Sequence, residues 1–340
     1  MPKGFARALI LSLLLSIVAI ALVIALIGSP SGLGAILNLS WRSLLLGGLL
    51  LGLSFFVGGL RIQRLLYATG SSLSAWRAMR TFILGIFSAA LTPSGGGNAP
   101  AIALSLIHER ISPPVAWSVT IYTSTLDLLF FGWSLPVAVL ILRRSDYFGR
   151  PWLLWLGLGL SVLFLGLWVG LAFFLSRLER LLGILLSPRA LRRWRRPAWR
   201  FLRRMNEVTS IITGRRLTTH LSLQGLTLLL HGSVYSIFFV FARGLGAELA
   251  FAPTMALMFL VSVTSYVIPT PGASGYLELA VSFAFAKELE ISLLTAAVVA
   301  YRAISYYLTI VIGALLGGNI LAREIADTAR ADAGNEGVTD

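Results

Sequence analysis

Long apolar runs dominate the chain and predict membrane-spanning helices. A helix needs roughly 18 to 20 apolar residues to cross about 30 Å of hydrocarbon, and six runs reach that length. The first, residues 8–27, is longer than the apolar core of a signal peptide, and we expect it to be a span. The six predicted spans cover residues 8–27, 39–60, 114–142, 152–175, 219–242 and 291–318.

Two pairs of shorter apolar segments each meet at a break rich in proline and glycine. Both residue types interrupt helices, and a backbone group freed at membrane depth must find a partner in protein or in a wet cavity. The second segment of each pair has about 11 residues, which is roughly 16 Å of helix or half a bilayer. Each pair therefore predicts a re-entrant helical hairpin. The segments are 75–91 with 98–108, joined at Thr92–Asn98, and 252–268 with 275–286, joined at Pro269–Gly275.

The placement of arginine predicts the orientation. Basic residues mark cytoplasmic loops, and the loop 177–216 carries 12 arginines against Glu179 and Glu207. With this loop inside, both termini are cytoplasmic, and loop 143–151 faces outside although it carries arginines of its own. The other basic residues assigned to the cytoplasm are Lys3, Arg7, Arg61, Arg64, Arg77, Arg80, Arg323 and Arg330.

This topology makes the two halves of the chain inverted copies. The first hairpin enters from the cytoplasm and the second from outside, so halves 8–142 and 152–318 have opposite orientations. The predicted fold is an all-α polytopic membrane protein with two inverted repeats, six spanning helices and two re-entrant hairpins. It forms a single membrane domain, residues 1–320, followed by a polar tail, 321–340, that we expect to be disordered. Inverted repeats with broken helices are typical of transporters.

Composition excludes several functional classes. A chain with 57% hydrophobic and 12% charged residues and a mean hydropathy of +0.84 is no soluble domain, so its net charge of +14 indicates topology rather than nucleic-acid binding. It has no cysteine, and His108, His220 and His231 lack the spacing of a metal site. We expect no enzyme, no cofactor and no metal. Aromatic residues and leucines alternate with arginines within 177–216, which indicates an interfacial helix on anionic lipid or a simple topology anchor.

The candidate chemistry lies in ionisable residues at membrane depth and in the two breaks. Asp127 or Glu278 could neutralise Arg302 as a buried structural pair, or the three could form a polar site; His231 could contact a headgroup or a proton. The half-helix after each break presents unpaired N–H groups that suit a phosphate or carboxylate. The candidate substrate-binding residues are Pro93, Gly95, Gly96, Gly97, Asn98, Asp127, Pro271, Gly272, Ser274, Gly275, Glu278, Tyr301 and Arg302.

These motifs resemble the flippase-like family built on the transmembrane region of lysylphosphatidylglycerol synthase, the non-catalytic half of the multiple peptide resistance factor. The resemblance covers about residues 5–320. The chain departs from the family at Ala99-Pro100-Ala101, where a basic residue is common, and at Ala273, where a second glycine is usual. The motifs are Thr92–Gly97 leading to His108-Glu109-Arg110 and Asp127, and Ile268–Gly275 with Glu278 and Tyr301-Arg302.

The resemblance implies a flippase or transporter that moves a phospholipid between the leaflets of a prokaryotic inner membrane. The headgroup of this lipid could be aminoacylated or otherwise modified. Synthesis of the lipid is not implied, because we expect no aminoacyltransferase domain after the last span. The half-helix N-termini and Arg302 would hold the phosphate, and Asp127 with Glu278 would receive a cationic headgroup.

Two other functions stay open. One is a secondary transporter of a small soluble solute, which predicts a sealed central site, whereas lipid use predicts a lateral opening. The other is a non-catalytic membrane partner of a lipid-modifying enzyme. As partners we expect membrane phospholipids, with anionic lipid at 177–216, and no nucleic acid; a homo-oligomer is also open.

Overall fold

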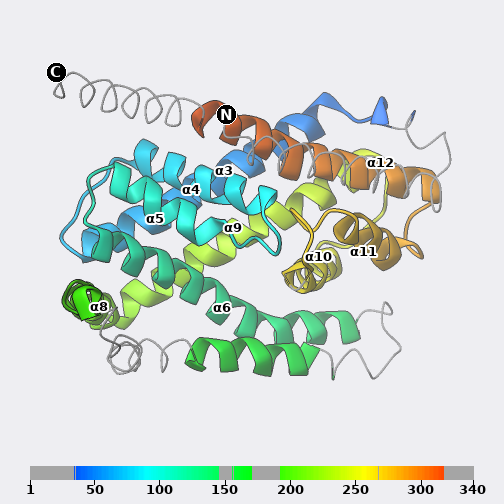
Figure 1. Ribbon diagram of the computed structural model, residues 1–340. Helices are drawn as coiled ribbons and strands as arrows, with labels where there is room; N and C mark the ends of the chain where they lie inside the picture. Colours follow the sequence, from blue (N-terminus) through cyan, green and yellow to red (C-terminus); the bar gives the residue numbers. More distant parts are fainter. Residues whose placement is uncertain are drawn as a thin grey trace, which may run out of the picture.

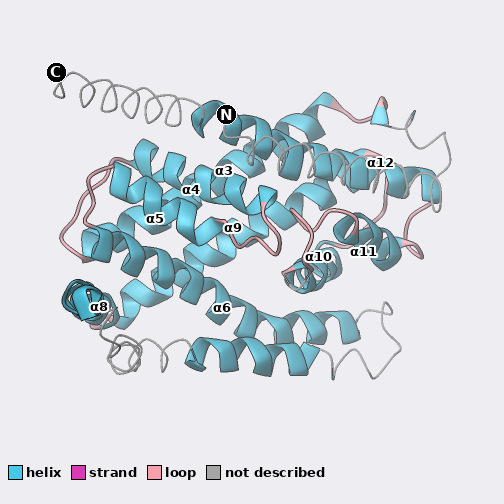
Figure 2. Cartoon of the chain, viewed as in Figure 1, coloured by secondary structure: helices cyan, strands magenta, loops and turns pink. Residues whose placement is uncertain are grey.

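The computed structural model describes residues 34, 36–144, 155, 157–170, 192–266 and 268–317. Within these ranges the chain is helical, with connecting loops and no strand (Figure 2). The predicted span 8–27, the tail 321–340 and most of loop 143–151 lie outside the described residues. The predicted span 152–175 is described in part, as the apolar helix Gly157–Gly170.

Within the described residues, four helices are long and apolar enough to cross a membrane, which makes the chain an integral membrane protein. Their mean hydropathy lies between 1.6 and 2.0. Each overlaps a predicted span. They are α3 (Trp41–Ala68), α6 (Pro113–Arg144), α9 (Leu217–Gly244) and a helix over Ile291–Gly317 that contains α12 (Ile291–Arg302) and the π-helical turn η2 (Ala303–Leu308).

The end of α3 corrects the sequence prediction. The helix runs to Ala68, eight residues beyond the predicted end at residue 60. Arg61 was assigned to a cytoplasmic loop, but it lies inside the helix with only 2% of its surface exposed. The apolar face continues past it through Ile62, Leu65 and Leu66, which follow helical spacing and are fully buried. The arginine is retained there because it has a carboxylate partner, described below.

Both short pairs form hairpins of antiparallel helices. The first consists of α4 (Ala75–Leu91) and α5 (Asn98–His108), with the predicted bounds; the second consists of α10 (Phe251–Ser265) and α11 (Tyr276–Phe285). Ser74 begins α4 by accepting a hydrogen bond from the backbone N–H of Arg77. The two hairpins lie toward opposite ends of the molecule, with their break loops between them (Figure 1).

Two runs of four elements follow one another in the same order along the chain. Helices α3 and α9 have the same length of 28 residues, and each of the other three elements in the first run also has a counterpart in the second. Every counterpart begins 176 to 178 residues later. The pairs of first residues are Trp41 and Leu217, Ala75 and Phe251, Asn98 and Tyr276, and Pro113 and Ile291.

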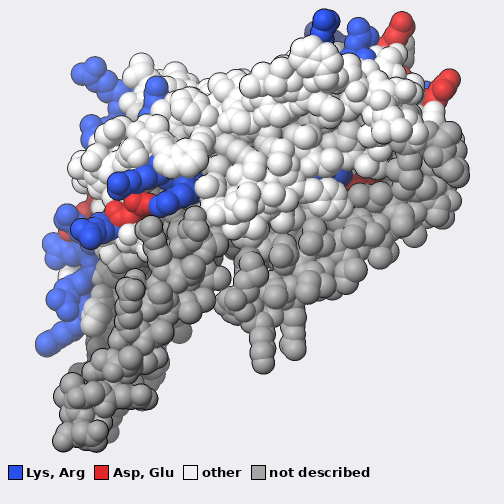
Figure 3. Space-filling model, turned by 90° about the horizontal axis from the view of Figure 1, so that it is seen from above, with Lys and Arg blue, Asp and Glu red and all other residues white. Residues whose placement is uncertain are grey.

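Helix α8 (Arg192–Thr213) is amphipathic and packs across one end of the bundle. It carries seven arginines and one acid, Glu207. Its buried face is apolar, with Leu202, Met205, Val208 and Ile212 at helical spacing. The Ser118 hydroxyl on α6 donates to the Met205 carbonyl at 3.2 Å. Lys and Arg side chains gather at this end, whereas the middle of the visible face is almost free of charge (Figure 3).

Candidate functional site

The two break loops, far apart in the sequence, meet in the structure. Pro93 and Pro271 form an isolated antiparallel backbone bridge. The Ser94 hydroxyl donates to the Ile268 carbonyl at 3.2 Å, so a side chain of the first loop also binds the second. Pro93 follows the end of α4 by two residues, whereas α10 ends at Ser265, before Pro271. Neither proline has an N–H to continue a helical ladder. The candidate residues of both breaks therefore lie at one place.

Both loops make the same turn. In each, the N–H two residues after proline donates to the threonine carbonyl before proline, and the next N–H donates to the proline carbonyl, at distances of 3.0 to 3.3 Å. Two consecutive residues of each loop have left-handed φ angles between 51° and 68°, a region that favours glycine. These are Ser94 and Gly95 in the first loop and Gly272 and Ala273 in the second.

Glu278 and Arg302 form a closed ion pair behind the second break. The Arg302 Nε lies 2.8 Å from Glu278 Oε1, with side-chain exposures of 4% and 0%. The other carboxylate oxygen, Oε2, accepts the Gly275 N–H at 2.9 Å and so caps α11. Both oxygens of the buried acid thus have a partner.

The remaining contacts of Arg302 also go to the loop. Its Nη2 donates to the Ser274 hydroxyl at 3.2 Å and its Nη1 to the Gly272 carbonyl at 3.5 Å, while the guanidinium carbon lies 4.0 Å from the centre of the Tyr306 ring. Tyr301 is buried and packs edge-on against Phe238. Of the two interpretations left open by the sequence, this geometry favours the structural pair for Glu278 and Arg302.

The first break carries no charged side chain and is more open. Pro93, Ser94 and Gly96 are exposed, whereas Pro271 and Ser274 are buried. A Cβ at Gly97 would overlap Ser88, so that glycine is needed for a close approach to α4. The two breaks therefore have the same backbone turn in different surroundings.

Asp127 pairs with Arg61 rather than with Arg302, so that, of the two acids predicted as alternatives for neutralising Arg302, Glu278 is the one that does so. The Arg61 Nη1 lies 3.0 Å from Asp127 Oδ1, and its Nη2 donates to the Thr123 carbonyl at 3.0 Å. Arg61 is 3% exposed, but the Asp127 side chain is 29% exposed. The pair joins α3 to α6.

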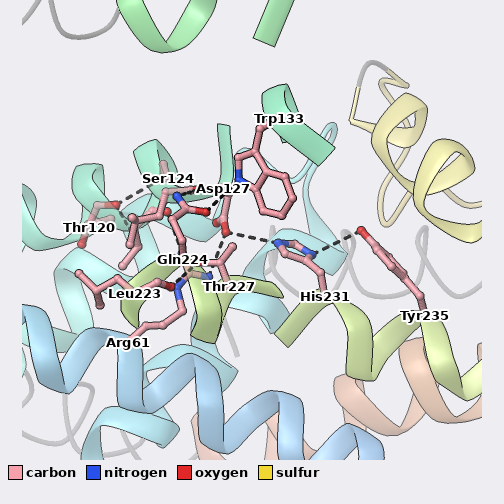
Figure 4. A network of polar contacts seen from close by, with 12 residues as sticks. Arg61, Thr120, Ser124, Asp127, Trp133, Leu223, Gln224, Thr227, His231 and Tyr235 are labelled. Atoms are coloured by element: carbon pink, nitrogen blue, oxygen red, sulfur yellow. Dashed lines mark hydrogen bonds and ion pairs between the residues drawn. The ribbon is translucent and has the colours of Figure 1, made fainter. Parts of the chain in front are cut away.

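His231 of α9 completes this cluster (Figure 4). Its Nε2 lies 3.3 Å from Asp127 Oδ1 and its Nδ1 lies 3.4 Å from the Tyr235 hydroxyl. The imidazole stacks on Phe130, with ring centres 5.0 Å apart and planes 4° from parallel. Within the described residues both partners of Asp127 contact Oδ1, and Oδ2 has neither a hydrogen bond nor an ion pair.

Two pockets border the helices that carry this cluster; Tyr235 lines the second of them, and Arg61, Asp127 and His231 line neither. One, of about 640 Å³, lies between α6, α8, α9 and the helix Gly157–Gly170. The other, of about 530 Å³, lies between α3, α6, α9 and α10 and has an almost wholly apolar lining. Gln224 lines the first and Trp133 the second, and the Trp133 indole donates to the Gln224 side chain at 3.4 Å. Polar lining of the first pocket includes Tyr122, Thr125, Asn206, Ser210 and His220.

Arg61 was missed as a site residue because it was counted as a loop arginine. The signal that could have found it is the apolar spacing that continues beyond residue 60. Gln224 and Tyr235 gave no signal in the sequence, since their roles depend on which helices lie side by side. Among the described residues, no group of three or more His, Asp or Glu side chains could hold a metal ion.

Comparison with known proteins agrees with this architecture. The family model of the lysylphosphatidylglycerol synthase transmembrane region matches residues 9–313. A UPF0104 membrane protein of Archaeoglobus fulgidus is 22% identical over 318 residues, which cover 90% of this chain and 94% of that protein. The matched residues include both break loops, Arg61, Asp127 and His231. The chain belongs to the family of the lysylphosphatidylglycerol synthase transmembrane region.

Proposed function

We propose that the protein moves a phospholipid between the leaflets of a prokaryotic cytoplasmic membrane and that the headgroup passes Asp127. The observation that carries the proposal is the free oxygen of this acid. Asp127 is the fifteenth residue of a 32-residue helix, close to its middle. A charged residue at such depth costs about 2.5–3.5 kcal/mol or more, and the Oδ2 of this partly exposed side chain has a lone pair for a headgroup hydroxyl or ammonium group.

The apolar pocket favours a lipid over a soluble solute. Several of its lining residues are also exposed on the outside of the bundle, among them Leu53, Val137, Leu229 and Phe251. The pocket is thus a lateral opening on apolar helix faces, which suits an acyl chain. Tyr235 lines this pocket and contacts His231, so that the tail and headgroup positions adjoin.

The repeated elements support a transporter built from inverted halves. Four elements recur in the same order at a spacing of 176 to 178 residues, and the two break loops share one turn and meet antiparallel. Two hairpins that approach from opposite ends and meet in the middle suit re-entrant segments entering from the two membrane faces. With basic α8 on the cytoplasmic side, the first hairpin enters from the cytoplasm.

In this proposal the two candidate clusters have different roles. Arg61, Asp127 and His231 contact the passing headgroup. Glu278 and Arg302 hold the second break loop in its turn instead of binding lipid, because their polar atoms face each other and the loop. The protein acts as a transporter without chemical conversion of the lipid.

Vesicles containing the purified protein and a fluorescent phospholipid test the proposal by dithionite quenching. We expect wild type to expose inner-leaflet lipid well above protein-free vesicles, and Asp127→Asn to reduce this rate about tenfold or more. The matched control is Glu288→Gln, an exposed acid in the turn after α11 that lies outside the cluster of Arg61, Asp127 and His231. Equal rates for wild type and Asp127→Asn, or no rate above protein-free vesicles, would contradict the proposal.

A further inference from the structure

One feature of the cluster exceeds what a headgroup contact needs. A carboxylate, an imidazole and a phenol follow one another from α6 to α9, with 3.3 Å between Asp127 and His231 and 3.4 Å between His231 and Tyr235. Tyr235 reaches the lining of the apolar pocket, and the Asp127 side chain is 29% exposed. Histidine is the side chain that gains and loses a proton near neutral pH, so this chain of groups can hold and pass one.

The charges around His231 come to zero when its ring is neutral. Arg61 from α3 contributes one positive charge and Asp127 from α6 one negative charge. The other elements packed against the ring contribute aromatic side chains: Phe130 and Phe131 from α6, and Phe259 from α10 through its contacts with both. The phenols nearby are Tyr235 and, against Phe131, Tyr266.

We propose that His231 takes up one proton with each anionic lipid headgroup that passes, so that the protein is a proton–lipid symporter. This rests on the proposed lipid transport. One added proton gives the cluster one positive charge, which matches the single negative charge of a phosphodiester. The complex of lipid, proton and protein is then neutral, and a neutral complex avoids the cost of an unbalanced charge at membrane depth.

The geometry defines the step. A carboxylate beside Arg61 can only accept, so the neutral imidazole carries its hydrogen on Nε2 and presents the lone pair of Nδ1 to the Tyr235 hydroxyl. The proton adds to Nδ1, the Tyr235 hydroxyl turns from donor to acceptor, and the imidazolium then attracts Asp127 in competition with Arg61. When the lipid has reached the other leaflet, Nδ1 releases the same proton to that side of the membrane, and the ring is neutral again.

Arg61 has an N–H group that can donate a hydrogen bond to the anion. Its buried Nε has no hydrogen-bond partner within the part of the chain that the structure describes. When the imidazolium shares Asp127, the guanidinium can turn toward a phosphate, with which arginine forms strong charge-assisted hydrogen bonds. A hydroxyl of the same headgroup can donate to Asp127 Oδ2.

Helix α8 indicates that the lipid is an anion. Its outer face is basic, with Arg196, Arg200, Arg203 and Arg204 exposed, and Glu207 is the acid in the helix. Such a surface concentrates anionic lipid at the membrane interface. The 640 Å³ pocket lies between this helix and α6 and α9, on the side of the collected lipid.

The test is lipid movement under an imposed pH gradient. Fluorescent phosphatidylglycerol is added to the outer leaflet of proteoliposomes, and its inward movement is followed by dithionite quenching. With the outside one pH unit more acidic, we expect faster inward movement and an inner-leaflet enrichment that approaches about tenfold, the limit set by one proton per lipid. A pH-sensitive dye inside the vesicles should report proton entry only when the labelled lipid is present.

Variants assign the effect to the cluster. His231→Gln should show no response to the gradient, whatever its basal rate of lipid movement, and Tyr235→Phe, which keeps the ring, should show a response reduced severalfold. His108→Gln, an exposed histidine at the end of α5, should respond as wild type does. If His231→Gln does not fold, the lipid-dependent proton entry in wild type still decides the matter.

The outcomes separate the two proposals. Wild-type lipid movement that is the same with and without a gradient, or that is faster when the inside is more acidic, overturns symport and leaves lipid transport standing. A full gradient response in His231→Gln also overturns it. Absence of lipid movement in wild type under every condition overturns both.

Discussion

Among the arginine–carboxylate pairs in the described residues, Arg302–Glu278 and Arg61–Asp127 differ in how completely the acid is used. Glu278 is fully buried, and its two oxygens have separate partners, Arg302 and the Gly275 N–H. Asp127 is 29% exposed, and both of its partners contact the same oxygen. The chemistry of the two pairs is the same, but the first is a closed structural contact and the second has an oxygen available to a ligand.

The comparison shows why an acid at membrane depth is an incomplete guide to function. Removal of one partner from a buried pair leaves an uncompensated charge, which costs about 3–5 kcal/mol. Stability alone can therefore account for a buried charged pair, without any role in binding. The oxygen without a partner on a partly exposed side chain, rather than the presence of the charge, distinguishes the two clusters.

Glu278→Gln should have the largest effect on stability. The change leaves Arg302 buried beside a neutral amide and weakens the cap of α11, so we expect a loss of about 3–5 kcal/mol in the free energy of unfolding in detergent. The double variant Glu278→Leu/Arg302→Met removes both charges and should recover part of that loss. If Glu278→Gln unfolded at the same denaturant midpoint as wild type, the Glu278–Arg302 pair would not be a stabilising contact.

Gly272→Ala should have the next largest effect, because it disturbs the loop that the closed pair holds. Gly272 has a φ of 58°, and a Cβ there would overlap the Tyr306 ring, so we expect a loss of about 2–3 kcal/mol. Gly95→Ala in the first loop is the matched control. It has a φ of 68° but no atom nearer to a Cβ than Ala89, so about 1 kcal/mol is expected. Equal losses would mean that the two loops are under the same constraint.

Much of this fold follows from local sequence. A cluster of proline and glycine interrupts the apolar pattern after residue 91, so the first hairpin has the predicted bounds, with helices at residues 75–91 and 98–108. A single proline is not enough to end a helix, since Pro136 lies inside α6 and Pro197 inside α8. The long spans follow from apolar length alone. The end of α10 was predicted three residues too late, at 268, because apolar residues continue after the helix has ended at Ser265.

The ion pairs could not be predicted in the same way, since a pairing depends on which helices are neighbours. Asp127 could be placed in a span from sequence, but its partner lies 66 positions earlier on a helix that was predicted to end before Arg61. His231 was kept only as a lone candidate, because nothing local places α9 against α6. Glu278 and Arg302 were grouped from the sequence, and they form an ion pair. Their burial, which favours a structural pair over a binding site, depends on packing and could not be predicted.

Asp127→Asn should affect transport more than stability. The amide still accepts from Arg61, and its side chain reaches an exposed region, so we expect the loss in unfolding free energy to be below about 2 kcal/mol and smaller than that of Glu278→Gln. The lipid transport rate should fall about tenfold, equivalent to about 1.4 kcal/mol. Measurement of both quantities on the same protein preparation is decisive. A variant that loses stability and transport in proportion would place Asp127 in the structural class.

Tyr306→Phe should have the smallest effect and would separate the two contacts that Tyr306 makes around the closed pair. Its hydroxyl donates to the Ala90 carbonyl at 3.2 Å, which ties the last spanning helix to the first hairpin, while its ring lies against the Arg302 guanidinium. Phenylalanine keeps the ring and loses the hydrogen bond, so we expect a loss of about 0.5–1.5 kcal/mol. Tyr306→Leu removes the cation–π contact as well and should cost about 1–2 kcal/mol more. The difference between these two variants measures how far the aromatic face stabilises the buried arginine. Equal losses would assign the stabilisation of Arg302 to Glu278 and the loop alone.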